Sequence, residues 1–207
     1  VSFANCGLPY FAGGIIEDRQ ELILQTPESL KARFNLDVRT RHEVLSIDTG
    51  ANSLQVKDLQ ADSILNIEYD NLILSLGAAP FIPPMDGSEH LLTLRNIYDV
   101  DVLVEKIGKA KQASGKAIVA GAGFIGLEIA ENLVEQGLKV TLIELAPQVL
   151  PPLDADMSSY VANELRNHEV ELVLGTSVVS ATENSVTLSD GRSLEADLLF
   201  ASIGVRP

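Results

Sequence analysis

The chain has 207 residues, of which 46% are hydrophobic, enough for one large or two modest globular domains with a real core. Its 29 acidic and 15 basic side chains give a formal net charge of −14, spread along the sequence, which argues against a nucleic acid partner. No apolar run reaches the about 18 residues that cross a bilayer, and no basic-then-apolar leader opens the chain. We therefore expect a soluble protein with no membrane partner.

Two features of the chain bear on its compartment and its completeness. Cys6 is the only cysteine, which excludes an internal disulfide and is consistent with a reducing cytoplasm. The first residue is Val1 rather than methionine, and the last four residues follow directly on a strand-like run. We expect a cytoplasmic protein, and a segment of a longer polypeptide.

The first third of the chain predicts one short helix followed by strands. In the run TPESLKARF, Thr26 is the expected N-cap and Pro27 the first helical residue, where its missing N–H costs nothing. Apolar and β-branched residues then recur in short runs bounded by turn residues, which predicts strands. The predicted strands are residues 38–47, 53–59, 64–69 and 71–77.

Beyond the proline-rich stretch 80–84, the pattern changes to alternating strands and helices, so this stretch is the predicted connection between two units. The order strand, helix, strand, helix, strand predicts a parallel sheet with right-handed crossovers, that is, an α/β doubly wound domain. A hairpin turning at Asp190-Gly191 and a buried-looking strand follow. The predicted elements are strand and turn 116–123, helix 124–136, strand 139–144, helix 155–167, strand 170–175 and strand 197–204.

A glycine-rich loop stands between the first predicted strand and helix of this α/β domain. Its sequence, Gly-Ala-Gly-Phe-Ile-Gly over residues 121–126, matches the G-x-G-x-x-G fingerprint of dinucleotide sites, in which a helix N-terminus faces the pyrophosphate. The alternative is a tight turn that binds no ligand. The predicted NAD-binding loop residues are Gly121, Ala122, Gly123, Phe124, Ile125 and Gly126.

Glu144 ends the next predicted strand, 23 residues after Gly121, where an acidic side chain accepts the adenosine ribose hydroxyls. The residues that follow, Leu-Ala-Pro-Gln, provide no arginine for a 2′-phosphate. The sequence therefore predicts NADH rather than NADPH as the preferred form.

The environment of Cys6 allows two interpretations. A lone cysteine is often a small buried hydrophobe. Its neighbours Ser2, Asn5 and Gly7 are seldom found in a hydrophobic core, and a position at the start of a helix, near backbone N–H donors, favours a reactive thiolate.

Five runs in chain order, SFANCGLPY, YDNLILSLGAAP, AIVAGAGFIGLEIAENL, VTLIE and ASIGVRP, closely resemble the single-cysteine flavoprotein disulfide reductases. Within them the sequence is most similar to coenzyme A disulfide reductases and CoA-dependent NADH sulfur (persulfide or polysulfide) reductases. The resemblance implies that NAD(P)H reduces FAD, which passes electrons to Cys6. It also implies that Cys6 rests as a mixed disulfide with coenzyme A.

The resemblance also implies residue roles and a domain plan. Residues 1–100 correspond to part of an FAD-binding domain of the same superfamily and residues 101–207 to a Rossmann-like NAD-binding domain. The first FAD fingerprint, a later FAD strand and the C-terminal dimerisation domain are not among the 207 residues. The FAD site is therefore expected to be incomplete, the fragment inactive and the parent a homodimer. The implied residues are Ser2, Asn5 and Arg33 (with Lys31) for CoA, Glu128 and Gly204 for NAD, and Val44, Ser75, Leu76 and Gly77 for FAD.

Other interpretations stay open at this point. Lys31 and Arg33 suit the solvated face of a short helix equally well, and Glu128 suits an ordinary first helical turn. The same scaffold also serves NADH oxidases and peroxidases, in which the cysteine cycles through sulfenic acid. A third alternative is a non-catalytic dinucleotide-binding module. The three histidines have no paired spacing, which predicts no metal site.

Overall fold

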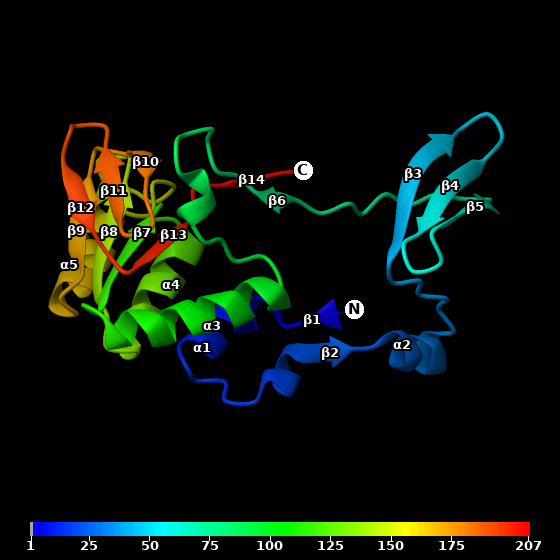
Figure 1. Cartoon of the computed structure of the whole chain (residues 1–207), viewed down its shortest axis with the longest axis horizontal. Coiled ribbons are helices and arrows are strands. Elements are labelled where there is room, and N and C mark those ends of the chain that lie inside the picture. The colour runs from blue at the N-terminus through cyan, green and yellow to red at the C-terminus, as the bar shows by residue number, and fades with distance from the viewer. Residues whose placement is uncertain (1) are drawn as a thin grey trace. The chain divides into compact units, whose positions relative to one another are not determined.

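The computed structural model describes residues 2–207 and shows a mixed α/β protein (Figure 1). Its contacts divide these residues into two compact units. The first comprises residues 2–3 and 23–77, and the second comprises Ala4–Leu22 and Ala78–Pro207. This division by contacts changes at residues 77–78 and differs from the predicted functional domains 1–100 and 101–207, which stay a prediction. No helix among residues 2–207 has the length and apolar character needed to cross a membrane.

The first unit contains a short antiparallel pair of strands, one helix and a three-stranded meander. Helix α2 begins as predicted, because the Thr26 hydroxyl accepts a hydrogen bond from the N–H of Ser29 and Pro27 opens the helix. The antiparallel order of the meander is β3-β4-β5. The elements are β1 (Ser2–Phe3), β2 (Ile23–Gln25), α2 (Pro27–Phe34), β3 (His42–Asp48), β4 (Ser53–Asp58) and β5 (Ser63–Glu68).

Two strand predictions in this unit are wrong in part or in full. The strand predicted from residue 38 begins only at His42. The apolar run 71–77 forms no strand, and its side chains Ile73 and Leu76 are 87% and 88% exposed. A strand needs a neighbour for its backbone N–H and C=O groups, and no strand within residues 2–207 pairs with this run. Apolar composition alone therefore did not decide its conformation.

The second unit is built on a parallel sheet with the strand order β13-β7-β8-β9. Helix α4 connects β7 to β8 and packs on both, and α5 connects β8 to β9 and packs on β9. The predicted α/β class, the strand–helix alternation and the parallel pairing are confirmed. The elements are β7 (Lys116–Ala120), α4 (Phe124–Glu135), β8 (Lys139–Glu144), α5 (Ala155–Asn167), β9 (Glu171–Leu174) and β13 (Leu198–Ala201).

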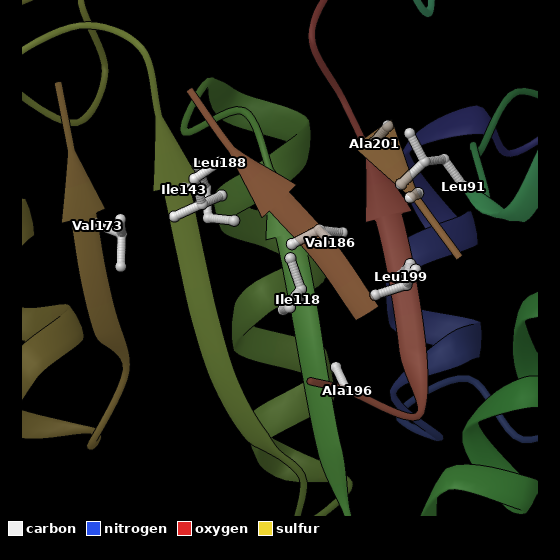
Figure 2. Close-up of a cluster of buried hydrophobic side chains, with 10 residues drawn as sticks. Leu91, Ile118, Ile143, Val173, Val186, Leu188, Ala196, Leu199 and Ala201 are labelled. Atoms are coloured by element: carbon white, nitrogen blue, oxygen red, sulfur yellow. The ribbon is translucent and has the colours of Figure 1, made fainter. Parts of the chain in front are cut away.

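A three-stranded antiparallel sheet packs on the parallel sheet and closes one hydrophobic core. Its order is β10-β11-β12, and the hairpin between β11 and β12 turns at Asp190-Gly191 as predicted. Figure 2 shows Val186 and Leu188 of β11 against Ile118, Ile143 and Leu199 of the parallel strands. The strands are β10 (Val178–Ala181), β11 (Ser185–Leu188) and β12 (Ser193–Glu195).

The segment that carries Cys6 belongs to the second unit and packs against its helices. Helix α1 contacts both α3 and α4, and Arg19 of η2 makes a bidentate ion pair with Asp101 of α3, both N···O distances being 2.8 Å. The remaining elements are η1 (Asn5–Gly7), α1 (Leu8–Ala12), η2 (Arg19–Leu22), β6 (Ala79–Pro80), η3 (Ser88–His90), α3 (Ile97–Gln112) and β14 (Val205–Arg206).

Candidate functional site

Two glycines of the loop between β7 and α4 are required by close backbone approach. Gly121 has φ +101°, and a Cβ there would lie 2.5 Å from the carbonyl oxygen of Ser202. A Cβ on Gly126 would collide with the carbonyl oxygen of Gly121 and lie 2.7 Å from Ser202 Oγ. Only glycine lets the helix, the loop and the end of β13 come this close. The loop is therefore shaped by the fold around it.

The middle glycine has a different environment. A Cβ on Gly123 would have no heavy atom within 4 Å, and its φ of −79° suits any residue. Gly123 is the N-cap of α4 and makes no side-chain cap, so the first N–H groups of a 12-residue helix have no side-chain acceptor there. Open space in front of a helix N-terminus is the arrangement that accepts a phosphate group.

Glu144, at the end of β8, forms a hydrogen bond with the backbone of the glycine loop. Its Oε2 accepts a 2.7 Å hydrogen bond from the N–H of Ala122, and its Oε1 accepts one of 2.8 Å from the N–H of Ala146. Each carboxylate oxygen has a further lone pair, which leaves acceptor capacity for two ribose hydroxyls. The carboxylate thus lies at the loop, as the sequence predicts, and also bonds to two backbone N–H groups.

A cavity of about 530 Å³ opens at the carboxyl ends of β7, β8 and β13. In open α/β sheets, ligands bind at this edge, where the chain order reverses between neighbouring strands. Here β7 has β8 on one side and β13 on the other. The open face of Gly123 and this cavity together fit a dinucleotide. Its lining includes Gly121, Gly123, Glu144, Leu145, Pro151, Thr176, Ser177, Ser202 and Ile203.

Sequence reasoning missed Ser202, Thr176 and Ser177 at this cavity. Ser202 Oγ donates a 3.1 Å hydrogen bond to the carbonyl oxygen of Gly121, so it fixes the loop from the end of β13. The signal that could have identified these three residues is the order of the strands in the sheet. Strands β9 and β13 end at the same edge as β7, and the residues that follow them therefore meet the glycine loop.

Six other residues predicted for NAD do not line this cavity: Ala122, Phe124, Ile125, Gly126, Glu128 and Gly204. Phe124 and Glu128 instead line a second cavity of about 350 Å³ between α4 and α5. Gly204 has φ +132° and is exposed, two residues after Ser202. Ala122 is fully buried, its N–H donates to Glu144, and its carbonyl oxygen accepts a hydrogen bond from the N–H of Leu150. Ile125 is 45% exposed on α4.

Cys6 lies in the 3₁₀ turn η1 and its side chain is exposed, which is unlike a buried structural cysteine. Asn5 is its neighbour in the same turn. Ser2, in β1, and Arg33, on the exposed face of α2, belong to the other compact unit, as does Lys31. Arg33 lies over the ring of Phe34, 5.0 Å from its centroid.

The four residues predicted for FAD also lie in the first unit. Val44, in β3, is 51% exposed, and Ser75, Leu76 and Gly77 lie in the unpaired run. Neither of the two cavities described here is lined by them. Among residues 2–207, no group of three or more His, Cys, Asp or Glu side chains is placed to hold a metal ion.

The fold is of the doubly wound α/β class, and its glycine loop matches the fingerprint of dinucleotide sites. The profile of the pyridine nucleotide-disulphide oxidoreductase family matches residues 2–207, and the chain belongs to this family.

Three named proteins are similar to this chain. The coenzyme A disulfide reductase of Staphylococcus haemolyticus (strain JCSC1435) is 36% identical over 207 residues, covering 100% of this chain and 46% of the relative. The structure of reduced Bacillus anthracis CoADR-RHD matches with a TM-score of 0.94 and 43% identity, covering 100% of this chain and 38% of that one. A water-forming NADH oxidase from Lactobacillus brevis bound to NADH matches with a TM-score of 0.90 and 32% identity, covering 100% and 46%. The chain therefore spans about half the length of the curated relatives it matches.

Proposed function

We propose that this chain is part of an NADH-dependent flavoprotein that reduces coenzyme A disulfide, coenzyme A persulfide or polysulfide through Cys6. One observation carries the proposal. The exposed thiol of Cys6 lies next to α1, a helix that packs against α4, and α4 is the helix opened by the glycine loop. An exposed thiol and the glycine loop thus belong to one packed unit. The similarity to coenzyme A disulfide reductases supports the choice of substrate.

In this proposal, the N-terminal N–H groups of α4 at Gly123 hold the pyrophosphate of NADH, and Glu144 accepts the ribose hydroxyls. Glu128 and Gly204 lie near the nicotinamide in this proposal, and Phe124 and Ile125 belong to the loop that faces the dinucleotide. NADH is preferred because the Glu144 carboxylate repels a 2′-phosphate. The four residues after Glu144, Leu-Ala-Pro-Gln, include no arginine that could bind such a phosphate.

Val44, Ser75, Leu76 and Gly77 are the residues of this chain that we assign to FAD. The chemistry that a bound FAD supplies is two-electron transfer between a reduced nicotinamide and sulfur. The remaining FAD contacts come from other parts of the complete protein. Residues 1–207 alone are accordingly expected to be inactive.

Cys6 performs the sulfur chemistry. Its thiolate attacks one sulfur of CoA–S–S–CoA, which breaks the S–S bond, forms a Cys6–S–S–CoA mixed disulfide and releases one CoA thiolate. Two electrons, originating from NADH, then reduce the mixed disulfide, restore the Cys6 thiolate and release the second CoA thiolate. The sum is NADH + H⁺ + CoA disulfide giving NAD⁺ and two CoA thiols. One cysteine suffices because CoA provides the partner sulfur, with Ser2, Asn5 and Arg33 as its proposed contacts.

The proposal is tested on the complete protein purified from its own gene. We expect NADH oxidation that depends on added CoA disulfide, and a coenzyme A adduct on Cys6 in the intact mass of the resting enzyme. Cys6→Ser is expected to abolish turnover while leaving NADH binding unchanged. A Cys6→Ser enzyme with wild-type turnover contradicts the proposal. Size-exclusion chromatography of the same sample tests the proposed homodimer.

A second candidate is an NADH oxidase or peroxidase, favoured by the similarity to the L. brevis enzyme. In that case Cys6 cycles through sulfenic acid, and the resting protein carries one added oxygen on Cys6 and no coenzyme A. A third candidate is a non-catalytic dinucleotide-binding module. It predicts that Cys6 of the complete protein resists alkylation at neutral pH.

A further inference from the structure

Asn132, on the face of α4 that meets α1, is the one buried side chain among residues 2–207 that has a polar atom without a hydrogen-bond partner. It is 2% exposed, and its Nδ2 donates a 2.8 Å hydrogen bond to the carbonyl oxygen of Glu128 in the preceding helical turn. Its Oδ1 has no such partner and faces Gly13, the C-cap of α1. An orphaned buried oxygen is costly, so its placement calls for a reason.

The side chain of Asn132 leaves no room for a Cβ at Gly13. The φ of −74° and ψ of −8° at Gly13 are open to any residue, so its conformation does not require glycine. A Cβ at this position would collide with Asn132 Oδ1 and lie 2.7 Å from Cγ and 2.9 Å from Cβ of the same side chain. The missing side chain therefore serves only to let α1 approach α4 this closely. The Gly13 hydrogen that replaces the side chain points at Oδ1 and gives that oxygen a weak C–H···O contact.

One turn further along α4, Gln136 forms a hydrogen bond with Gly13 at the end of α1. Gln136 Nε2 donates to the carbonyl oxygen of Gly13 at 2.5 Å. Asn132 and Gln136 are four residues apart, so both face α1 from one side of α4. Shape complementarity and a hydrogen bond thus fix the end of α1 at one position on α4.

This contact relates the two functional parts of the unit. Helix α1 has only five residues and starts two residues after Cys6, with Leu8 buried at 1% exposure. Helix α4 starts at the glycine loop and meets α1 near its other end. We infer that Asn132, assisted by Gln136, is a positioning residue that sets the location of the Cys6 thiol relative to the dinucleotide loop. The inference rests on the proposed function of Cys6, and it assigns to α4 a role beyond nucleotide binding.

The test uses the complete protein, reduced with dithiothreitol and desalted, and measures the rate constant for iodoacetamide alkylation of Cys6 at fixed pH. Gly13→Ala introduces the collision with Asn132 without backbone strain. Gly13→Ala combined with Asn132→Gly removes the three atoms nearest to the new methyl group, Oδ1, Cγ and Cβ of Asn132. Gly108→Ala adds the same methyl group on α3, where no atom lies within 4 Å, and serves as the control.

We expect Gly13→Ala to change the alkylation rate constant at least about threefold, in the lower range of coupling between residues in direct contact. The double variant is expected to return toward the wild-type value, and Gly108→Ala to equal it. If Gly13→Ala does not fold, Gln136→Leu, which removes the donor to Gly13, must show the change. A lowered Tm with an unchanged rate constant, or a double variant no closer to wild type than Gly13→Ala, overturns the inference.

Alkylation requires no turnover, so this result is independent of the proposed activity. Wild-type turnover in Cys6→Ser would contradict the proposed function while leaving the packing result standing. Conversely, Cys6→Ser could abolish turnover while Gly13→Ala leaves the alkylation rate constant of Cys6 unchanged. That result would contradict only the positioning role of Asn132.

Discussion

The carboxylate of Glu144 accepts a 2.7 Å hydrogen bond from the N–H of Ala122, which ties the end of β8 to the glycine loop 22 residues earlier. The same carboxylate accepts a bond from Ala146, so one side chain fixes the loops that follow two neighbouring strands. Its proposed role at the ribose is added to this structural role. Replacing Glu144 is therefore expected to affect both loop order and nucleotide choice.

Glu144→Gln is expected to weaken both roles. The glutamine carbonyl oxygen can still accept one backbone N–H, but its NH₂ group faces the other donor. We expect the Kd of NADH to rise about tenfold, from the loss of about one charge-assisted hydrogen bond, as measured by titration calorimetry on the complete protein. An unchanged Kd would contradict the assignment of Glu144 to the ribose.

Nucleotide preference is tested by Glu144→Ala together with Leu145→Arg. Removing the carboxylate and adding a guanidinium should favour a 2′-phosphate, since a charge-assisted hydrogen bond contributes about 1.5–3 kcal/mol. The ratio of kcat/KM for NADPH over NADH is expected to rise at least about tenfold. Glu144→Ala alone is the control, which should weaken NADH without this gain for NADPH.

Gly123→Ala and Gly126→Ala form a matched pair within the loop. The methyl group at Gly123 enters open space, so Tm should be unchanged while NADH affinity falls. The methyl group at Gly126 meets the carbonyl oxygen of Gly121, so the free energy of unfolding should fall by about 1–3 kcal/mol. Thermal melts and NADH titrations of both variants check this. Equal effects of the two substitutions on Tm would show that the loop is not shaped as described.

The ion pair between Arg19 and Asp101 predicts a pH dependence of stability. Hydrogen bonds from Arg19 lower the pKa of Asp101 against the opposing effect of desolvation. Because the folded pKa lies below the unfolded value of about 3.9, the pair stabilises the fold above that pH. Its contribution is lost as the pH falls through the folded pKa.

Asp101→Asn is therefore expected to lower Tm at pH 7, and the difference from wild type should shrink as the pH falls below the unfolded value of about 3.9 and through the folded pKa of Asp101. The control is Asp37→Asn, which removes an exposed pair with the near neighbour Arg39 and should change Tm little at either pH. A Tm difference for Asp101→Asn that does not shrink as the pH is lowered contradicts the assignment.

The sequence predicted the second unit well because its signals are local. The loop 121–126, the helix 155–167 and the turn at Asp190-Gly191 each follow from residues within one element or its flanks. The run 71–77 was misjudged, since strand formation depends on a partner that composition does not reveal. At the cavity, Ser202 was missed because it lies 81 residues after Gly121. The two residues meet only because β13 pairs with β7 in the sheet. Gly13 and Asn132 were missed because they, too, are distant in the sequence.

The pairing of β13 with β7 has a consequence for biosynthesis. Leu198 pairs with Ala117, so the strand that covers one edge of β7 leaves the ribosome only after 81 further residues. At about 5–20 residues per second, that edge waits for about 4–16 s. During this interval one edge of β7, an interior strand of the finished sheet, presents unpaired backbone N–H and C=O groups between apolar side chains, and such an edge can pair with strands of other chains.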